Sequence, residues 1–492
     1  MSENEYYKVR LEKAEALRKE GLNPYVNGVY PENLAKTLRD EFDCKSTEEL
    51  EALGKRVTLA GRVIAVRSFG KAGFLQLRDR SGEMQIFTQK SKMGEMGDVT
   101  LENLDIGDFI FVEGVLFRTK TNELTVRAEN LRFVTKSLQT LPEKWHGLTD
   151  VEARYRRRYV DLIANPEVKD TFIKRSKIVS FMRRYFEEHD FLEVETPMMH
   201  PIPGGAKARP FVTHHNTLDR DLYLRIAPEL YLKRLVVGGM ERVFEMNRNF
   251  RNEGLSTMHN PEFTMLEFYM AYATFEDLIR LSEDLLNKLA VHVCGSEKVS
   301  YQGQELSFAR PFQRLTLLES LQKYAGLNQA EVSDRKALLG LAAKHGVGIR
   351  DENAELGLIQ LTLFEELVEK QLVSPTFITQ FPTSVSPLSR RNDANPDIAD
   401  RFELFICGRE IANAFSELND PVDQKGRFLS QVEERESGDD EAMYFDEDYI
   451  TALEYGMPPT AGQGIGIDRL VMLLTDSPSI RDVILFPILR GS

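Results

Sequence analysis

The chain has 492 residues, 42% of them hydrophobic and 28% charged, with a formal net charge of −14. It is too long for one typical domain and apolar enough for real cores. The acidic balance disfavours a nonspecific nucleic-acid binder, although a local basic face still permits RNA. Three cysteines without a CxxC pair argue against a disulfide framework or zinc ribbon and fit a cytoplasmic protein. We find neither a signal peptide nor a membrane-spanning run, and expect no membrane partner.

The first predicted element is an amphipathic helix over residues 4–20, which Gly21 and Pro24 end. Its apolar positions fall near one stripe: Tyr6, Val9, Ala14 and Leu17. Packing against a domain is favoured over presenting a basic face to RNA. We assign residues 1–50 to an N-terminal helical extension.

From about residue 55 to 135 the hydrophobic period changes to two in five short segments. A break after the third segment is typical of a Greek-key barrel of the OB type, which we assign to residues 51–137. Such barrels often bind single-stranded nucleic acid by stacking bases on exposed rings. Phe74 and Gln85 suit a stacking ring and a base-edge reader if they point outward. Spacing alone favours a core position for Phe74.

A linker is predicted over residues 138–165, followed by one large domain over 166–492. The linker ends in the densest basic cluster of the chain: Arg154, Arg156, Arg157 and Arg158. This cluster is either a solvated helical face or a phosphate contact. In the large domain helical stretches alternate with strand-like ones, and residues 326–372 indicate a helix-rich insertion.

The segment 250–272 predicts a strand, a polar loop and a second strand, in a sequence without a P-loop motif. A period of two puts four side chains of the second strand on one face: Phe263, Met265, Glu267 and Tyr269. The same period puts Arg251 and Glu253 together opposite them, with His259 in the loop. Ordinary cross-strand ion pairs are the alternative. So many polar and aromatic groups on one hairpin favour a ligand site.

Arginine cannot lose its proton at ordinary pH, so Arg251 suits an α-phosphate that gains charge during a displacement. Phe263 is suited to stack on adenine and His259 to meet the outer phosphates. In GQGIGIDR at 462–469 the glycines permit a close approach, and Arg469 opens an apolar helix. A tight packing motif with a surface arginine explains this last segment equally well.

Three glutamates, Glu403, Glu410 and Glu417, are spaced by seven residues. On a helix they would form one acidic stripe. On a single flat strand the odd spacing would put neighbours on opposite faces, unless Gly408 supplies a bulge. Periodicity does not decide between these structures. Carboxylate oxygens suit Mg²⁺, which usually takes one or two carboxylates plus phosphate oxygens.

Several of these segments resemble class II aminoacyl-tRNA synthetases. FRNE with His259 and Phe263 is similar to their motif 2, GQGIGIDRLVMLL to motif 3, and HDFLEVETPMM at 189–199 to the dimer-forming motif 1. The motif order and the preceding barrel resemble the aspartate–asparagine–lysine subgroup. Within it, RYRRRYVDLI, PIPGGAKARPF and LYLRIAPELYLKRL resemble the bacterial-type lysyl-tRNA synthetases.

The resemblance implies an α+β multidomain chain, in which an OB-type barrel precedes a class II antiparallel sheet flanked by helices. It also implies a homodimer that uses ATP and Mg²⁺ to activate L-lysine and transfers it to the 3′ end of tRNA(Lys). The alternative is the same adenylation chemistry with a non-tRNA acceptor such as elongation factor P. The barrel argues against this alternative, because the paralogue that modifies that factor lacks one.

The resemblance also implies residue roles. Arg251 and Arg469 would be catalytic, and Glu403 and Glu410 would hold Mg²⁺. The ATP-binding set would be Arg251, Glu253, His259, Asn260, Phe263, Glu410 and Arg469. The lysine-binding set would be Gly205, Glu229, Glu267, Tyr269, Asn413 and Glu417. The anticodon set would be Phe74, Gln85 and Glu123. Charge complementarity agrees with the lysine-binding role, because three carboxylates suit an amino acid with two ammonium groups. Buried carboxylates are energetically unfavourable until a cation binds, so they also select against uncharged analogues.

Overall fold

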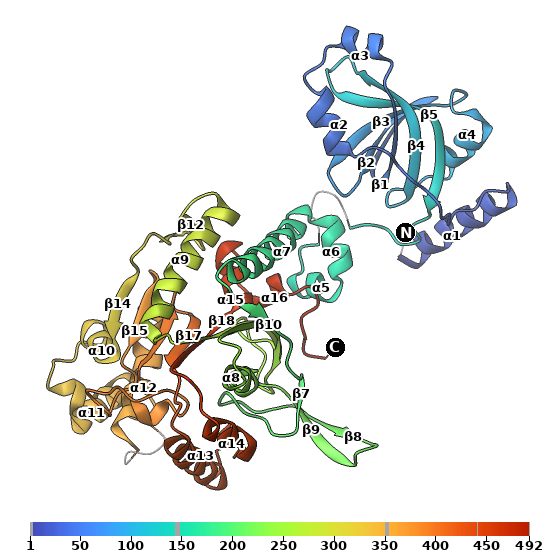
Figure 1. The fold of residues 1–492 in the computed structure, drawn as a ribbon. Helices are drawn as coiled ribbons and strands as arrows, with labels where there is room; N and C mark the ends of the chain where they lie inside the picture. The colour runs from blue at the N-terminus through green and yellow to red at the C-terminus, as the bar shows by residue number, and fades with distance from the viewer. Residues whose placement is uncertain (1–2, 143–147, 350–353, 440, 492) are drawn as a thin grey trace. The chain divides into compact units, whose positions relative to one another are not determined.

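The computed structural model describes residues 3–142, 148–349, 354–439 and 441–491. The chain divides into two compact units, Met1–Thr149 and Asp150–Ser492, each described here by itself (Figure 1). Residues 143–147 of the predicted linker and 350–353 of the predicted insertion lie outside the described residues. In the part of the chain that is described, no helix is both long and apolar enough to cross a membrane.

A closed five-stranded barrel forms the first unit and confirms the predicted OB-type fold (Figure 1). The strands run in the order β1-β2-β3-β5-β4, and helix α4 (Gly94–Glu102) fills the break after the third. Their bounds are β1 Arg56–Phe69, β2 Ala72–Arg78, β3 Glu83–Gln89, β4 Phe109–Arg118 and β5 Leu124–Thr135. Leu75 and Leu77 point inward, so their neighbour Phe74 lies on the outer face. The core position that spacing alone favoured for Phe74 is therefore wrong.

Helix α1 (Glu3–Lys19) is packed through a different stripe from the predicted one. Its buried residues are Arg10, Ala14 and Leu17, whereas Tyr6 and Val9 are exposed. The Arg10 guanidinium is buried because it donates to three backbone carbonyls, those of Ile106, Ser137 and Gln139 (2.9–3.0 Å). Two short helices, α2 (Ala35–Phe42) and α3 (Thr47–Leu53), complete this unit.

An eight-stranded sheet is the centre of the second unit (Figure 1). Its order is β14 (Gln313–Thr316), β15 (Thr376–Thr379), β16 (Arg401–Phe405), β17 (Glu410–Ser416), β18 (Thr460–Gly466), β11 (Glu262–Ala271), β10 (Arg242–Phe250) and β6 (Leu192–Glu193). All pairs from β15 to β10 are antiparallel, as predicted. Only the edge strands β14 and β6 pair in parallel, since long crossovers separate them from their partners.

Helices cover both faces of this sheet. One face buries Phe244 and Phe268 under α7 (Pro166–Glu187), α9 (Phe275–Cys294) and α15 (Ile467–Leu474), and Phe186 of α7 packs against both rings. The other face packs Val243 and Tyr269 against α8 (Glu229–Val237) and α14 (Glu447–Glu454), beside α13 (Pro421–Glu436). Because side chains alternate along β11, its residues with odd numbers face this second side.

The helix-rich segment between β14 and β15 has an apolar core of its own. It contains α10 (Leu317–Ala325), α11 (Arg335–His345) and α12 (Leu356–Leu367), with short helices at Glu331–Ser333 and Glu369–Gln371. Other small elements are a sheet of β7 (Met199–His200), β9 (Arg220–Leu224) and β8 (Val212–His215), the hairpin β12 (Lys298–Tyr301) and β13 (Gln304–Ser307), a short helix at Thr383–Val385, and α16 (Ile480–Val483).

The basic cluster after the linker lies on α5 (Val151–Arg156) and α6 (Arg158–Ala164). Arg158 is buried, pairs with Asp161 (2.7 Å) and donates to the Arg481 carbonyl (2.7 Å). Arg154 also binds Asp161 (2.8 Å), and Arg156 donates to the Arg490 carbonyl (2.7 Å). Arg154 and Arg158 therefore hold these helices and the C-terminal segment together and are not part of a solvated face, whereas Arg156 and Arg157 are exposed. A phosphate contact by the exposed pair stays a prediction.

Candidate active site

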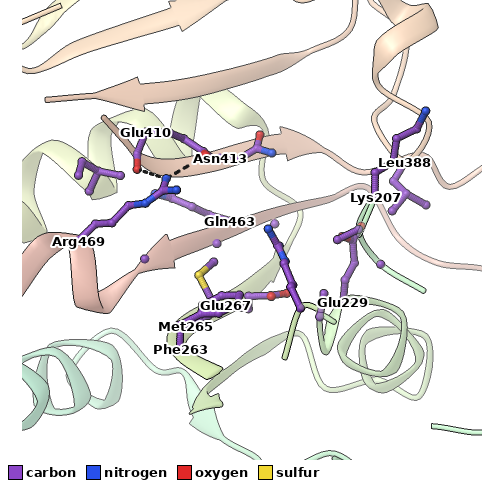
Figure 2. A pocket seen from close by; sticks show the side chains of 18 of the residues that line it. Lys207, Glu229, Phe263, Met265, Glu267, Leu388, Glu410, Asn413, Gln463 and Arg469 are labelled. Atoms are coloured by element: carbon purple, nitrogen blue, oxygen red, sulfur yellow. Dashed lines mark hydrogen bonds and ion pairs between the residues drawn. The ribbon is translucent and has the colours of Figure 1, made fainter. Parts of the chain in front are cut away.

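A cavity of about 450 Å³ opens on the face of the sheet beside α8. It is lined by β11, β17, β18, the start of α15 and the loop between β10 and β11. Twelve of the fourteen site residues predicted in this unit line it: Gly205, Glu229, Arg251, Glu253, His259, Asn260, Phe263, Glu267, Tyr269, Glu410, Asn413 and Arg469. Glu403 and Glu417 do not. Figure 2 shows Arg469 and Glu410 at one side of the cavity, Glu229 at the other, and Glu267 between them.

The hairpin of β10 and β11 supplies one wall of the cavity. Phe263, Met265, Glu267 and Tyr269 line it together, as the period of two predicts. The predicted placement of Arg251 and Glu253 on the facing strand is wrong, because β10 ends at Phe250 and both residues lie in the loop. The Arg251 amide still donates to the Pro261 carbonyl (2.9 Å), which keeps this residue at the end of the ladder.

Arg251 has an unused hydrogen-bond donor at the cavity. Its guanidinium lies 5.2 Å from the ring centre of Phe263, and its buried Nε atom has no hydrogen-bond partner among the residues that the structure describes. Buried polar groups in folded proteins are nearly always paired, and an arginine binds anionic oxygen strongly. The orphaned donor therefore fits an anionic ligand, such as a phosphate group beside a ring stacked on Phe263.

Residues from three distant segments meet at the other side of the cavity. Arg469 donates to the Glu410 carbonyl (2.7 Å) and pairs with the carboxylate of Glu410 (3.2 Å), and it lies 3.4 Å from His259 Nε2 (Figure 2). Burial, followed by Arg469, lowers the pKa of His259. Asp468 holds the first turn of α15 in place, because it accepts from the Thr264 amide (2.7 Å) and from Arg175 (2.6 Å).

The three spaced glutamates lie on a hairpin, which is neither of the structures that periodicity left open. Glu403 is on β16, Glu410 begins β17, and Glu417 follows β17. The two-residue turn between the strands has positive φ at both Cys407 (+52°) and Gly408 (+64°). Positive φ at both central residues is the conformation of a type I′ turn, whose twist matches that of the two strands in a hairpin. Gly408 thus forms the turn, while the register shift lies between Leu404 and Phe405.

Negatively charged side chains of this hairpin lie near those of α12 and the short helix after it. Burial, with added repulsion from Glu410 and Glu365, raises the pKa of Glu403 to about 7, although Arg401 opposes the shift. Burial and Glu410 likewise raise the pKa of Glu369 to about 7. No group of three or more metal-binding side chains is arranged to hold an ion by itself in the described ranges. Glu403 and Glu410 lie close enough to repel one another, and such a pair of carboxylates fits a Mg²⁺ ion that completes its coordination with phosphate oxygens.

Buried carboxylates surround the α8 end of the cavity. Burial and then Glu229 raise the pKa of Glu267 to about 8. Burial also raises the pKa of Glu229 and of Glu417, although Lys233 opposes both shifts. A Cβ atom on Gly462 would overlap both Glu417 and the ring of Tyr269. Glycine at this position of β18 is therefore required for these two side chains to approach one another.

Aromatic rings form a strip on the outer face of the barrel. The ring of Phe74 lies 5.2 Å from that of Phe87, its partner across β2 and β3, and Phe87 lies 6.0 Å from Phe117. Gln85 is on the same face of β3 and pairs with Gln76. Glu123 precedes β5 and binds Arg39 of α2 (2.7 Å). Phe74 and Gln85 thus lie on neighbouring strands, and Glu123 lies directly before the strand that pairs with β3.

Comparison with known proteins agrees with this geometry. Residues 150–490 match the family model described as tRNA synthetases class II (D, K and N). The chain belongs to this family. Residues 57–134 of the synthetase match the model of the OB-fold nucleic acid binding domain. It is 55% identical to the lysine–tRNA ligase of Methylobacillus flagellatus, over 99% of this chain and 96% of that protein. It is 56% identical to the lysine–tRNA ligase of Magnetococcus marinus, over 99% and 97%.

Two charged residues of the synthetase site were not found by sequence reasoning. Arg401 donates from Nε to Asn413 (3.1 Å) and forms an ion pair with Glu403, the partner of Asn413 across β16 and β17. Lys233 binds Glu229 (2.7 Å) and contacts Glu417. A spacing of four residues between Glu229 and Lys233 in ELYLKRL was the available signal for this second pair.

Proposed function

We propose that this synthetase is a lysine–tRNA ligase, which uses ATP to activate L-lysine and transfers it to the 3′ end of tRNA(Lys). The observation behind this proposal is the charge distribution in one cavity. Three buried carboxylates, Glu229, Glu267 and Glu417, surround one end, and Arg251 keeps an unused donor toward the other. An amino acid with two ammonium groups suits the first end, and a phosphate suits the second. The similarity to lysine–tRNA ligases over nearly the whole chain supports the same function.

In the first step the lysine carboxylate attacks the α-phosphorus of ATP, and pyrophosphate leaves. Arg251 holds the α-phosphate and Arg469 the outer phosphates, where they stabilise the charge of the transition state. Phe263 stacks on adenine, with Glu253, His259 and Asn260 beside the nucleotide. Glu403 and Glu410 would hold Mg²⁺, which supplies positive charge against the phosphates when bound. No side-chain nucleophile takes part.

Lysine is held by the groups at the α8 end of the cavity. These are Gly205, Glu229, Glu267, Tyr269, Asn413 and Glu417. Glu267 and Tyr269 share one face of β11, so a carboxylate and a phenol together accept from and orient the side-chain ammonium. Catalysis is then mostly positioning, because the pocket sets the amino-acid carboxylate in line with the α-phosphorus.

In the second step a terminal hydroxyl of tRNA attacks the carbonyl carbon of the lysyl-adenylate, so that an ester bond forms, the bond to the phosphate breaks and AMP leaves. The barrel reads the anticodon through Phe74, Gln85 and Glu123. We also propose a cytoplasmic homodimer that forms through motif 1. Phe191 of that segment is buried within the chain, so the contact uses its exposed residues Leu192 (54% exposed) and Met199 (52% exposed).

Pyrophosphate exchange with each of the twenty amino acids tests the first step. We expect lysine alone to drive rapid exchange. Charging of tRNA(Lys) and of elongation factor P, compared in parallel, tests the acceptor, and we expect only the tRNA to be charged. Preference for another amino acid would contradict the proposal, and modification of elongation factor P alone would favour the alternative acceptor.

A further inference from the structure

Lys233 is a fully buried cation directly behind the cavity, and none of the roles above uses it. It lies on α8 with 0% of its side chain exposed. Its ammonium is 2.7 Å from Glu229 and contacts the carboxylate of Glu417. The rings of Phe415 and Tyr449 lie 5.4 and 6.0 Å from it and close the remaining sides.

Lys233 stays protonated in this position. Burial by itself would lower the pKa of its ammonium, but the carboxylates of Glu229 and Glu417 raise it above its ordinary value. A buried charge without a partner is strongly unfavourable, whereas a paired one is tolerated. Lys233 and the two glutamates therefore depend on one another for their ionised states.

The net charge of these groups determines which ligand the cavity can accept. Around the α8 end of the cavity lie three carboxylates, with the Lys233 ammonium behind them, so the net charge of these four groups is about −2 when all are ionised. Free lysine brings two ammonium groups. Among the described residues Glu267 makes no ion pair, and Asn249 offers it a long hydrogen bond of 3.5 Å. Lys233 thus offsets one of the three carboxylates and leaves two for the ammonium groups of the proposed substrate.

We propose that Lys233 is a specificity-determining positioning residue, the fixed counter-ion that keeps Glu229 and Glu417 ionised and in place so that the pocket accepts an amino acid with two ammonium groups. This inference rests on the proposed function, since it assumes that lysine occupies the cavity. Lys233 acts through the glutamates that it orients, and it lies behind them rather than in the cavity.

The test compares Lys233→Met, which removes the charge, with Lys233→Arg, which keeps it. In pyrophosphate exchange at neutral pH, we expect Lys233→Met to raise the KM for lysine at least about tenfold, with the KM for ATP within about twofold. Lys233→Arg should retain most of the lysine affinity. Lys288→Met is the matched control, because Lys288 makes the same kind of pair with Asp284, four residues earlier, on the exposed side of α9.

A pH series separates this role from simple packing. The charged and titratable groups that face Glu229 and Glu417 are Lys233, Glu267, Tyr269, Arg401 and Tyr449. Without the ammonium, nothing from Lys233 opposes the burial that raises the pKa of both glutamates, so lysine binding must release more protons than in the wild type. The KM for lysine should therefore fall more steeply with rising pH in Lys233→Met than in the wild type.

Three results would overturn the inference. One is a Lys233→Met variant with the lysine KM and pH profile of the wild type. Another is an equal loss of lysine and ATP affinity in both Lys233 variants, which would indicate packing alone. Should Lys233→Met not fold, the double variant Lys233→Met/Glu417→Gln removes both charges and should fold with weakened lysine use; its failure to fold is the third. A wild-type enzyme that does not activate lysine would instead contradict the proposed function.

Discussion

The buried position of Glu267 favours the protonated form of its carboxyl group. The side chain is 7% exposed, and burial raises its pKa from 4.5 to about 8. Between these two values the folded chain binds one proton more than the unfolded chain. Raising the pH through this window therefore lowers the free energy of unfolding of the ligand-free protein. It also strengthens lysine binding, because an ammonium group prefers the ionised carboxylate.

Replacing Glu267 by glutamine should weaken lysine use selectively. The change keeps the shape and removes a charge-assisted hydrogen bond, on the order of 1.5–3 kcal/mol. In pyrophosphate exchange the KM for lysine should rise about tenfold to a hundredfold, with ATP binding little changed. The rise in lysine affinity up to pH 8 should also become shallower. Glu262→Gln is the control, because Glu262 precedes the cavity on β11 and pairs at the surface with Arg248 (3.5 Å). Wild-type lysine kinetics in Glu267→Gln would contradict the pocket assignment.

At the level of elements, the outer face of the barrel gives a separate prediction. Phe74→Ala removes a ring from the strip that includes Phe87 and Phe117, and with it a base-stacking contact of roughly 1–3 kcal/mol. Aminoacylation of tRNA(Lys) should weaken, while lysine-dependent pyrophosphate exchange stays near wild type. Tyr30→Ala, which removes an exposed ring outside the barrel strands, should change neither activity. Equal loss of both activities in Phe74→Ala would mean that the ring only stabilises the barrel.

Elements with a regular pattern could be predicted from the sequence, and those set by distant contacts could not. The barrel strands and the face of β11 follow from a period of two. The acidic hairpin did not follow, because its turn at Cys407 and Gly408 interrupts the period. The buried stripe of α1 was predicted incorrectly in part, because the charged side chain of Arg10 is buried and donates to backbone carbonyls far along the chain. The pair of Lys233 and Glu417 joins segments 184 residues apart, and no local pattern marks it.

At the scale of the whole molecule, we predict a homodimer. Motif 1 leaves Leu192 exposed on the edge strand β6 and Met199 exposed on β7, and large apolar side chains on a surface often mark an interface. Light scattering at micromolar concentration should give twice the chain mass of 56.3 kDa. Leu192→Lys should shift the population toward the monomer, and Leu53→Lys, at an exposed site in the first unit, should not. A monomeric and fully active wild-type enzyme would contradict the prediction.

The functional organisation of the whole chain came from the order of its motifs rather than from composition. The net charge of −14 pointed away from nucleic acid, yet the chain matches a nucleic-acid-binding barrel model and a tRNA synthetase model. The net charge is a sum over all residues of both units, so it does not reveal a local binding site for nucleic acid. From the sequence, a ligand site could be inferred only at the predicted hairpin of residues 250–272, where several polar residues lie together.

Arg401 has a consequence for the order in which ligands assemble. One guanidinium group binds Asn413, which we propose to hold lysine, and Glu403, which we propose to hold Mg²⁺ beside the nucleotide. A ligand that moves either side chain changes the contacts that the arginine makes with the other. With these proposed roles, lysine and the nucleotide would share a coupling free energy through this group, and reciprocity requires each to change the affinity of the other by the same factor. The two substrates would then bind within one cavity as a cooperative pair.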